Sequence, residues 1–324
     1  MKVSIIIVNW NTENILYDCL QSVYANTGSL KFEVIVVDNA SSDGSVEMVK
    51  NNFPDVVLIE NESNRGFAAA NNQGMSIAIG KYVLLLNSDT VILDNAIVKT
   101  IKFADSTPEA AVVACKVLNR DRTLQSTCFM FPSLLNLIFV IARLDRLFPN
   151  NRLFGRERLT WCAWDNVLEV DVVAGCFMLV KQEAIKEVGV MDEQYFMYAE
   201  ETDWCYRMKQ TGWKILFTPT AEVVHLGEAS SRQMKPEMAS QLQASILLFF
   251  KKHRGRLSYR LACLFVGLSF FLRIPYWLGH TIFSKNDRNR DIQTTKTYAR
   301  IAFRALFGWQ ALCFQKQSLD SRRE

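Results

Sequence analysis

The chain of 324 residues lacks several features that define common classes of protein. With only 7 Pro and 14 Gly, it is neither collagenous nor a Pro/Gly-rich low-complexity chain. No two of its 8 Cys have CxxC spacing, which favours reduced, buried thiols over a zinc site or a disulfide framework. No GxGxxG follows the first apolar run and no Gly-Lys-Ser/Thr occurs, so the dinucleotide fingerprint and the Walker P-loop are both excluded. That run, Val3–Val8, is too short for a signal peptide, and we therefore expect the chain to stay in the cytoplasm.

The composition is otherwise that of a globular protein, with 49% apolar and 22% charged residues, and the length suggests one large domain or two smaller ones. The formal net charge of +4 hides an asymmetry. Residues 251–324 hold 15 Lys and Arg against 4 Asp and Glu, a net charge of +11, whereas residues 1–250 hold 22 against 29, a net charge of −7. A basic, apolar C-terminal part on an acidic body indicates an anionic membrane surface as partner, and no nucleic acid.

Four short apolar runs are typical of strands buried on both faces of a parallel sheet, because they lack polar alternation. The runs are Val3–Val8, Phe32–Val37, Val56–Ile59 and Tyr82–Leu86. Helical segments separate them, at Glu13–Ala25, Ser45–Asn52 and Phe67–Ile79. This alternation predicts an α/β fold with a doubly wound, mostly parallel sheet.

Polar residues follow each of these runs, at the carboxyl ends of the predicted strands, where such sheets bind ligands. The polar clusters are Asn9–Asn11, Asp38–Gly44, Asn61–Gly66 and Asn87–Asp89. Any one cluster could consist only of turn and N-cap residues, since loops require Asn, Asp, Ser and Gly. Four clusters at one edge of one sheet favour a binding site.

Seven motifs occur along residues 3–230 in a fixed order. They are VSIIIVNWN (3–11), VIVVDNASSDGS (34–45), NRGFAAANN (64–72), LLLNSDT (84–90), AGCFMLV (174–180), MYAEETDWCYR (197–207) and VVHLG (223–227). Together, though not singly, they resemble family-2 glycosyltransferases with the GT-A fold, and most of all the bacterial rhamnosyltransferase-like branch. The resemblance implies an inverting transfer of a sugar, rhamnose first, from a dTDP or UDP donor to a lipid-linked glycan in surface polysaccharide synthesis. A catalytically silent nucleotide- or glycan-binding module and a membrane scaffold remain as alternatives.

The resemblance implies a site for Mg²⁺ or Mn²⁺, which offsets the charge that develops on a departing diphosphate. Asn87-Ser88-Asp89 is a shortened form of the Asp-x-Asp usual in this fold. We therefore expect Asp89 to be a metal ligand and Asn87 a donor contact, although both could simply end a strand. By the same resemblance His225 completes the metal site; a structural histidine is the alternative.

The acidic run Glu200-Glu201-Thr202-Asp203 opens a predicted helix. Acidic residues there can serve only the helix dipole. The resemblance instead implies a base that takes the proton of the acceptor hydroxyl. In the family this base is the second residue of Glu-Asp, which maps it onto Glu201, with Glu in place of Asp as a departure. Glu200 is the second candidate, and Asp203 and Arg207 would bind the acceptor or brace the helix.

Other side chains are expected to contact the donor, again by resemblance. Asp38 would accept the base N–H of uracil or thymine. Asn64, Gly66 and Asn71 would line the diphosphate and the ribose, with Gly66 allowing a close backbone approach. The remaining expected substrate contacts are Asn9, Asn39 and Gly175.

We expect a catalytic domain over residues 1–240, with a nucleotide-binding half (1–105) and an acceptor half (106–240), followed by a basic amphipathic helical extension (241–324). In the extension, Leu261–Leu272 is apolar but Arg273 and Pro275 interrupt it, which favours an interfacial or re-entrant helix pair over a spanning helix. A helical lid is the alternative, and Leu134–Leu147 is a candidate for a second membrane contact. The expected location is the cytoplasmic face of the inner membrane, and deleting 251–324 is expected to remove membrane binding while sparing donor chemistry.

Overall fold

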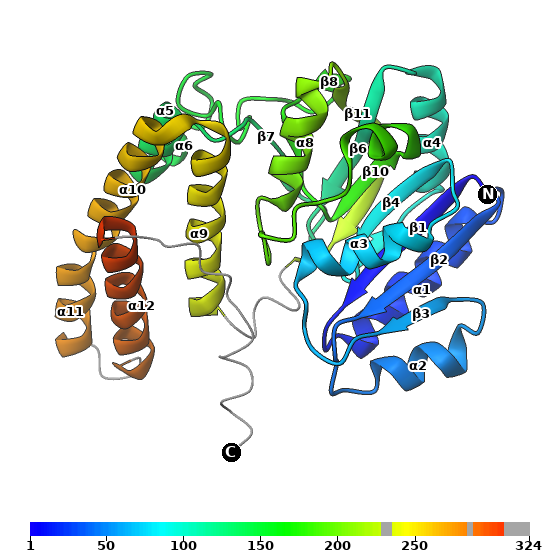
Figure 1. Ribbon diagram of the computed structural model, residues 1–324, viewed down its shortest axis with the longest axis horizontal. Coiled ribbons are helices and arrows are strands. Elements are labelled where there is room, and N and C mark those ends of the chain that lie inside the picture. Colours follow the sequence, from blue (N-terminus) through cyan, green and yellow to red (C-terminus); the bar gives the residue numbers. More distant parts are fainter. Residues whose placement is uncertain (228–234, 284–287, 308–324) are drawn as a thin grey trace.

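The computed structural model describes residues 1–227, 235–283 and 288–307 and has a central mixed sheet (Figure 1). Its strands are β1 (Val3–Asn9), β2 (Phe32–Asp38), β3 (Val57–Glu60), β4 (Tyr82–Asn87), β5 (Thr90–Ile92), β6 (Ala110–Leu118), β8 (Leu168–Glu169), β10 (Phe177–Lys181) and β11 (Lys214–His225). The order is β3-β2-β1-β4-β10-β6-β11-β5, with β8 paired to β11. β3, β2, β1 and β4 pair with one another in parallel, and β10 is antiparallel to both β4 and β6. The predicted α/β class with a mostly parallel sheet is confirmed.

The helices of the sheet domain alternate with its strands. They are α1 (Glu13–Thr27), α2 (Ser45–Asn52), α3 (Phe67–Ile77), α4 (Ala96–Ser106), α5 (Leu134–Ile141), α6 (Leu144–Leu147), α7 (Gln182–Val188) and α8 (Glu200–Gln210). A small second sheet pairs β7 (Cys128–Phe129) with β9 (Val172–Val173). The prediction that α3 reaches residue 79 is wrong. Ala78 is extended, and the next two amides donate to the side chains of Glu33 and Ser4 instead of continuing the helix.

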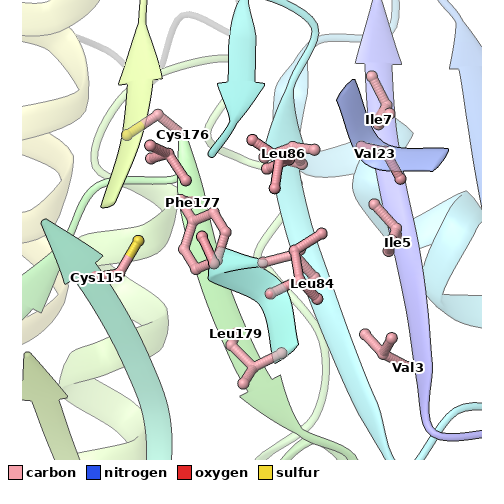
Figure 2. Close-up of a cluster of buried hydrophobic side chains, with 14 of the residues drawn as sticks. Val3, Ile5, Ile7, Val23, Leu84, Leu86, Cys115, Cys176, Phe177 and Leu179 are labelled. Carbon is pink, nitrogen blue, oxygen red and sulfur yellow. The ribbon is translucent and has the colours of Figure 1, made fainter. Parts of the chain in front are cut away.

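Apolar side chains fill both faces of the sheet, which explains why its strands lack polar alternation. Val3, Ile5 and Ile7 of β1 belong to one buried cluster, whereas Ile6 belongs to the other (Figure 2). The first cluster includes side chains of α1, α2 and α4, and the second includes side chains of α3, α7 and α8. The seven described cysteines are free, as predicted, and Cys313 lies outside the described residues.

The register of the parallel strands brings the polar clusters together. Asn9 at the end of β1 is the partner of Asp38 at the end of β2, and Val8 is the partner of Asn87 at the end of β4. The residues that follow these strands therefore share one edge of the sheet, because parallel strands end on the same side.

Four helices beyond the sheet domain form a bundle beside it (Figure 1). They are α9 (Lys235–His253), α10 (Gly255–Phe271), α11 (Ile274–Phe283) and α12 (Arg288–Phe307). Side chains of α9, α10 and α12 form a separate core against which Leu134 and Leu137 of α5 pack. The proposed division between residues 240 and 241 falls within α9. The stretch Gly255–Thr281, which includes a turn between α10 and α11, is long and apolar enough to cross a membrane.

Candidate active site

The carboxylate of Asp38 is fixed at the end of β2 by neighbouring side chains. Asn9 Nδ2 and Ser41 Oγ donate to Asp38 Oδ1 at 2.9 and 2.6 Å, and the Ser41 amide donates to Oδ2 at 2.8 Å. These bonds hold a turn in which Ala40 has a left-handed φ of +61°. The polar residues after β1 and β2 therefore form one ordered network. The expected contact of Asp38 with a nucleotide base stays a prediction.

The backbone at Gly66 approaches another segment more closely than any side chain would allow. Gly66 has φ +84°, and a Cβ there would lie 2.3 Å from the carbonyl oxygen of Phe196. Asn39 Nδ2 donates to the Gly66 carbonyl at 3.2 Å, and the Gly66 amide donates to Asn64 Oδ1 at 2.9 Å. Three residues predicted to face the donor are thus brought together, next to the segment that leads into α8.

Asn71 is part of α3, and Gly175 lies against Phe67, the first residue of that helix. Asn71 is buried, and its Nδ2 donates to the Phe67 carbonyl at 2.9 Å. A Cβ on Gly175 would lie 3.0 Å from the ring of Phe67. The small residue at 175 therefore makes room for an aromatic ring that packs against the second buried cluster. Their roles toward the donor remain predictions.

Asp89, His225 and Asn87 converge where β4 ends, although 136 positions separate Asp89 from His225. His225 Nε2 lies 3.0 Å from Asp89 Oδ1 and 3.1 Å from Asn87 Nδ2. The pairing of β11 with β5 produces this convergence, because His225 is the register partner of Thr90, the residue after Asp89.

Gln125, which is not among the predicted site residues, orients the ring of His225. Its Nε2 donates to Asn119 Oδ1 at 3.0 Å, which leaves its Oε1 to accept from His225 Nδ1 at 2.7 Å. With the proton on Nδ1, the lone pair of neutral His225 is on Nε2 and faces Asp89. No motif signals Gln125, because only the tertiary fold brings the segment after β6 to the end of β11.

The Asp89–His225 pair fits a divalent cation. Ligands at about 2.1 Å from an octahedral ion lie about 3 Å from their nearest neighbours, which matches the observed separation of 3.0 Å. A carboxylate oxygen and an imidazole nitrogen suit Mn²⁺, and the oxygen also suits Mg²⁺. Within the described ranges there is no group of three or more His, Cys, Asp and Glu side chains that could hold a metal.

Glu200, which is buried, and Glu201, which is partly buried, form an acidic pair at the start of α8. Burial raises the pKa of both carboxyl groups, and the charge of Glu201 raises the pKa of Glu200 further. The two carboxyl groups therefore titrate as a pair, and burial favours the states in which the pair holds a proton. The Oε2 atom of each is buried and, among the described residues, has no hydrogen-bond partner. Buried oxygens without a partner are uncommon in folded proteins, and a catalytic role or an ordered water is among the reasons for them.

Cys176 connects the acidic pair to the candidate metal ligands. Burial raises the pKa of its thiol to about 12, and the negative charges of Asp89 and Glu201 both add to the shift. Its carbonyl accepts from Thr90 Oγ1 at 3.2 Å and from the Asn87 amide at 3.2 Å. Asp89 and Glu201 therefore lie within electrostatic reach of one buried side chain, at the same part of the molecule.

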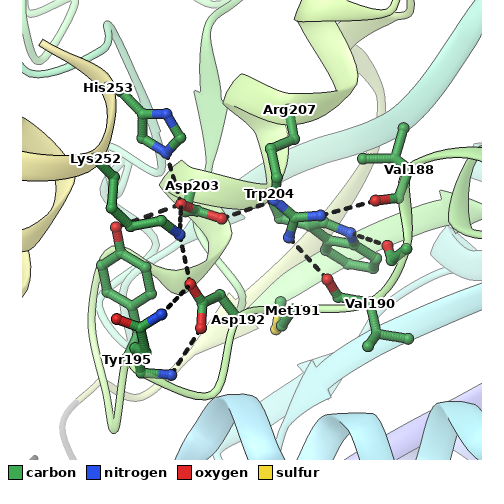
Figure 3. Close-up of polar contacts among 12 residues, drawn as sticks. Val188, Val190, Met191, Asp192, Tyr195, Asp203, Trp204, Arg207, Lys252 and His253 are labelled. Atoms are coloured by element: carbon green, nitrogen blue, oxygen red, sulfur yellow. Dashed lines mark hydrogen bonds and ion pairs between the residues drawn. The ribbon is translucent and has the colours of Figure 1, made fainter.

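Asp203 and Arg207 bond to each other and to the neighbouring backbone, and so brace α8 (Figure 3). Arg207 Nε donates to Asp203 Oδ2 at 2.8 Å, and its two Nη atoms donate to the carbonyls of Val188 and Val190 at 3.0 and 2.7 Å. The Asp203 side chain is 0% exposed. Of the two predicted roles, these contacts favour bracing over direct contact with the acceptor.

Comparison with known proteins assigns the family. Residues 4–189, more than half of the chain, match the sequence model of Glycosyl transferase family 2. The chain belongs to this family. It is 24% identical over 237 residues to the N-acetylglucosaminyl-diphospho-decaprenol L-rhamnosyltransferase of Mycobacterium tuberculosis, which covers 68% of this chain and 76% of the relative. It is 24% identical over 242 residues to rhamnosyltransferase WbbL of Escherichia coli K12, which covers 71% and 85%.

Solved structures confirm the fold of this family 2 chain. A mannosyltransferase of Pyrobaculum calidifontis in complex with GDP-Man and Mn²⁺ superposes with a TM-score of 0.57 at 16% identity, over 94% of this chain and 87% of the other. GalNAc-T7 with UDP, GalNAc and Mn²⁺ superposes with a TM-score of 0.53 at 16% identity, over 69% and 44%. The predicted family and the GT-A fold are therefore confirmed.

Proposed function

We propose that this glycosyltransferase is an inverting, metal-dependent hexosyltransferase that moves rhamnose from a dTDP or UDP donor to a lipid-linked glycan. Two of its relatives are named for rhamnose transfer, and one of them for a diphospho-decaprenol acceptor. The observation that carries the proposal is the 3.0 Å contact between Asp89 and His225 at the end of β4. These two residues form one set of groups, and Glu200 and Glu201 at the start of α8 form the other.

Each set would carry out one part of the transfer. Asp89 and His225 would hold Mg²⁺ or Mn²⁺, which supplies positive charge to the diphosphate leaving group. Glu201, as the carboxylate of the pair, would accept the proton of the acceptor hydroxyl as its oxygen attacks the anomeric carbon of the donor. Glu200, whose pKa is raised by burial and by the charge of Glu201, would be the protonated member of the pair. The bond to the diphosphate breaks as the new glycosidic bond forms, which inverts the configuration at that carbon.

The C-terminal helices suit binding to the cytoplasmic face of an anionic membrane. Large apolar side chains are exposed on α10, and their spacing places them on one stripe of the helix. They are Leu257, Leu264, Leu268, Phe271 and Leu272. Ala262, Val266 and Phe270 face the bundle core instead. An apolar outer stripe on a basic segment supports a helix pair that lies in the membrane interface, which would bring the site to a lipid-linked acceptor.

Glu201→Gln is the variant that tests the mechanism, because it keeps the shape of the side chain and removes the base. We expect UDP or dTDP binding within about twofold of the unchanged chain and transfer at least about a hundredfold slower. Donors are chosen by a thermal-shift screen of nucleotide sugars with and without Mn²⁺. Glu222→Gln, which neutralises an exposed carboxylate on β11, is the matched control.

Full transfer activity in Glu201→Gln would refute the assignment of the base. If the unchanged chain neither transfers nor hydrolyses any nucleotide sugar, the alternative of a catalytically silent binding module is favoured.

A further inference from the structure

Helix α9 contacts the segment that carries Glu200 and Glu201 on both sides of this pair. Near the middle of α9, Ser245 Oγ donates to the Met197 carbonyl at 2.8 Å, and Gln241 Nε2 donates to the same carbonyl at 3.4 Å. At its C-terminal end, Lys252 Nζ and His253 Nε2 lie 2.6 and 2.7 Å from Asp203 Oδ1 (Figure 3). Glu200 and Glu201 lie between these two anchor points in the sequence.

The segment between the anchor points is strained. Tyr198 and Ala199 have left-handed φ values of +67° and +62°, directly before Glu200. Left-handed conformations are unfavourable for a residue with a side chain, and they persist only where surrounding contacts hold them. The contacts from α9 to Met197 and Asp203 are of this kind, since they fix the backbone on both sides of the strained residues.

Side chains of α9 help to balance the negative charge of the buried Asp203. Burial by itself would raise the pKa of Asp203, but hydrogen bonds from Lys252, His253 and Arg207 outweigh that effect and hold the pKa below its usual value. Two of these three partners belong to α9. A buried carboxylate that loses its charged partners is strongly destabilising, so the charge of Asp203 ties α8 to α9.

Aromatic contacts strengthen the junction between α8 and α9, which is formed by Asp203, Lys252 and His253. The ring of His253 lies 4.5 Å from that of Tyr206 on α8 and 5.0 Å from that of Phe249 on α9, measured between centroids. The next residue, Arg254, donates from Nε to the Pro132 carbonyl at 3.0 Å, and its guanidinium lies 5.6 Å from the Tyr206 ring. α9 thus contacts the acceptor half of the sheet domain through charge, hydrogen bonds and stacking at one place.

We propose that Lys252 and His253 are positioning residues: through Asp203 they fix the first turn of α8, and so hold Glu201 in the geometry that deprotonates the acceptor. The catalytic part of this inference rests on the proposed function of Glu201. If so, Glu200 and Glu201 are ordered only when the basic C-terminal helices are packed against α8. The bundle is therefore a component of the active-site scaffold as well as a membrane contact.

Deletion of residues 251–324, which is expected to spare donor chemistry, does not isolate this junction. The deletion removes both α9 partners of Asp203 and most of the bundle core. Point variants in the full chain test the junction more directly. Lys252→Met removes the charge that faces Asp203, and Lys252→Arg keeps it. Lys251→Met removes one charge from the same helical turn at an exposed position, so it is the matched control.

Amide hydrogen exchange of residues 197–208 in detergent is the first measurement. We expect Lys252→Met to speed exchange at least about tenfold there, while Lys252→Arg stays within about threefold of the unchanged chain and Lys251→Met matches it. Asp203→Asn should speed exchange to a similar degree, and the double variant Asp203→Asn with Lys252→Met should be no faster than Asp203→Asn. Unchanged exchange in Lys252→Met, or equal acceleration in Lys251→Met, would overturn the proposal.

Kinetics distinguish the junction from the proposed function. With the donor found by thermal shift, Lys252→Met should lower kcat about a hundredfold, since small misplacements of a base have effects of that size. The affinity for UDP with Mn²⁺ should change less than twofold, and Lys252→Arg should restore kcat. If exchange responds as expected but the unchanged chain transfers no sugar, the junction stands and the proposed function fails. If the unchanged chain transfers sugar and exchange does not respond, the proposed function stands and the junction fails.

Discussion

The contact between Gly66 and Phe196 gives a prediction whose size follows from the structure. A methyl group at residue 66 would lie 2.3 Å from the Phe196 carbonyl oxygen, which accepts from the Phe67 amide at 2.7 Å. Gly66→Ala therefore combines two effects. The backbone conformation, φ +84° and ψ 175°, belongs to a region that only glycine adopts easily and costs about 1–3 kcal/mol. Displacing Phe196 also breaks the hydrogen bond to Phe67, which costs a further 1–3 kcal/mol or so.

Gly189→Ala separates the two effects, because Gly189 has nearly the same backbone conformation in open space. Its φ is +85° and its ψ is 179°, and no atom of the described residues lies within 4 Å of the position of an added Cβ. Gly66→Ala should therefore lower the free energy of unfolding in urea by about 1–3 kcal/mol more than Gly189→Ala does. It should also weaken UDP binding, since Gly66 lies beside Asn39 and Asn64. Equal losses of stability in the two variants would refute the close approach.

Two further predictions concern the metal pair and the acidic pair. Gln125→Leu should weaken Mn²⁺-dependent UDP binding about 10–100-fold by calorimetry, because His225 loses the acceptor that orients it; an equal loss without Mn²⁺ would contradict this role. Glu200→Gln should raise the urea midpoint at pH 7.5 but not at pH 4. Burial and the charge of Glu201 raise the pKa of Glu200, so above the ordinary value of 4.5 the folded chain keeps a proton that the unfolded chain releases. Stability therefore falls by about 1.4 kcal/mol for each pH unit until Glu200 ionises in the folded chain as well. A gain of the same size at both pH values would contradict that account.

The sheet half of the molecule could be predicted from local pattern. Continuous apolar runs identified β1, β2 and β4, and their parallel arrangement followed from the helices between them. β3 was predicted one residue early, because its exposed edge position leaves a weaker pattern. The C-terminal helix pair was also foreseen, since the break at Arg273 separates α10 from α11.

The candidate site could be predicted only in part. Motif resemblance named Asp89, His225 and Glu201; the structure brings Asp89 and His225 together, and the role of Glu201 stays a prediction. Gln125 was missed because a polar residue after a strand carries no signal of its own. Asp203 was left between two roles because its partners, Lys252 and His253, are about 50 positions away in a segment assigned to the membrane.

By itself, the sequence determined the first four parallel strands with the helices between them, the family, and the separation of an acidic body from a basic C-terminal part. These properties follow from local apolar pattern, residue counts and motifs, which do not require knowledge of distant contacts. Only the tertiary structure decided what the basic part does at the active site. Lys251 and Lys252 are adjacent in the sequence and equally basic, yet only Lys252 faces a buried carboxylate. The direction of a side chain from a helix, and the charge it meets there, depend on how α9 packs against α8.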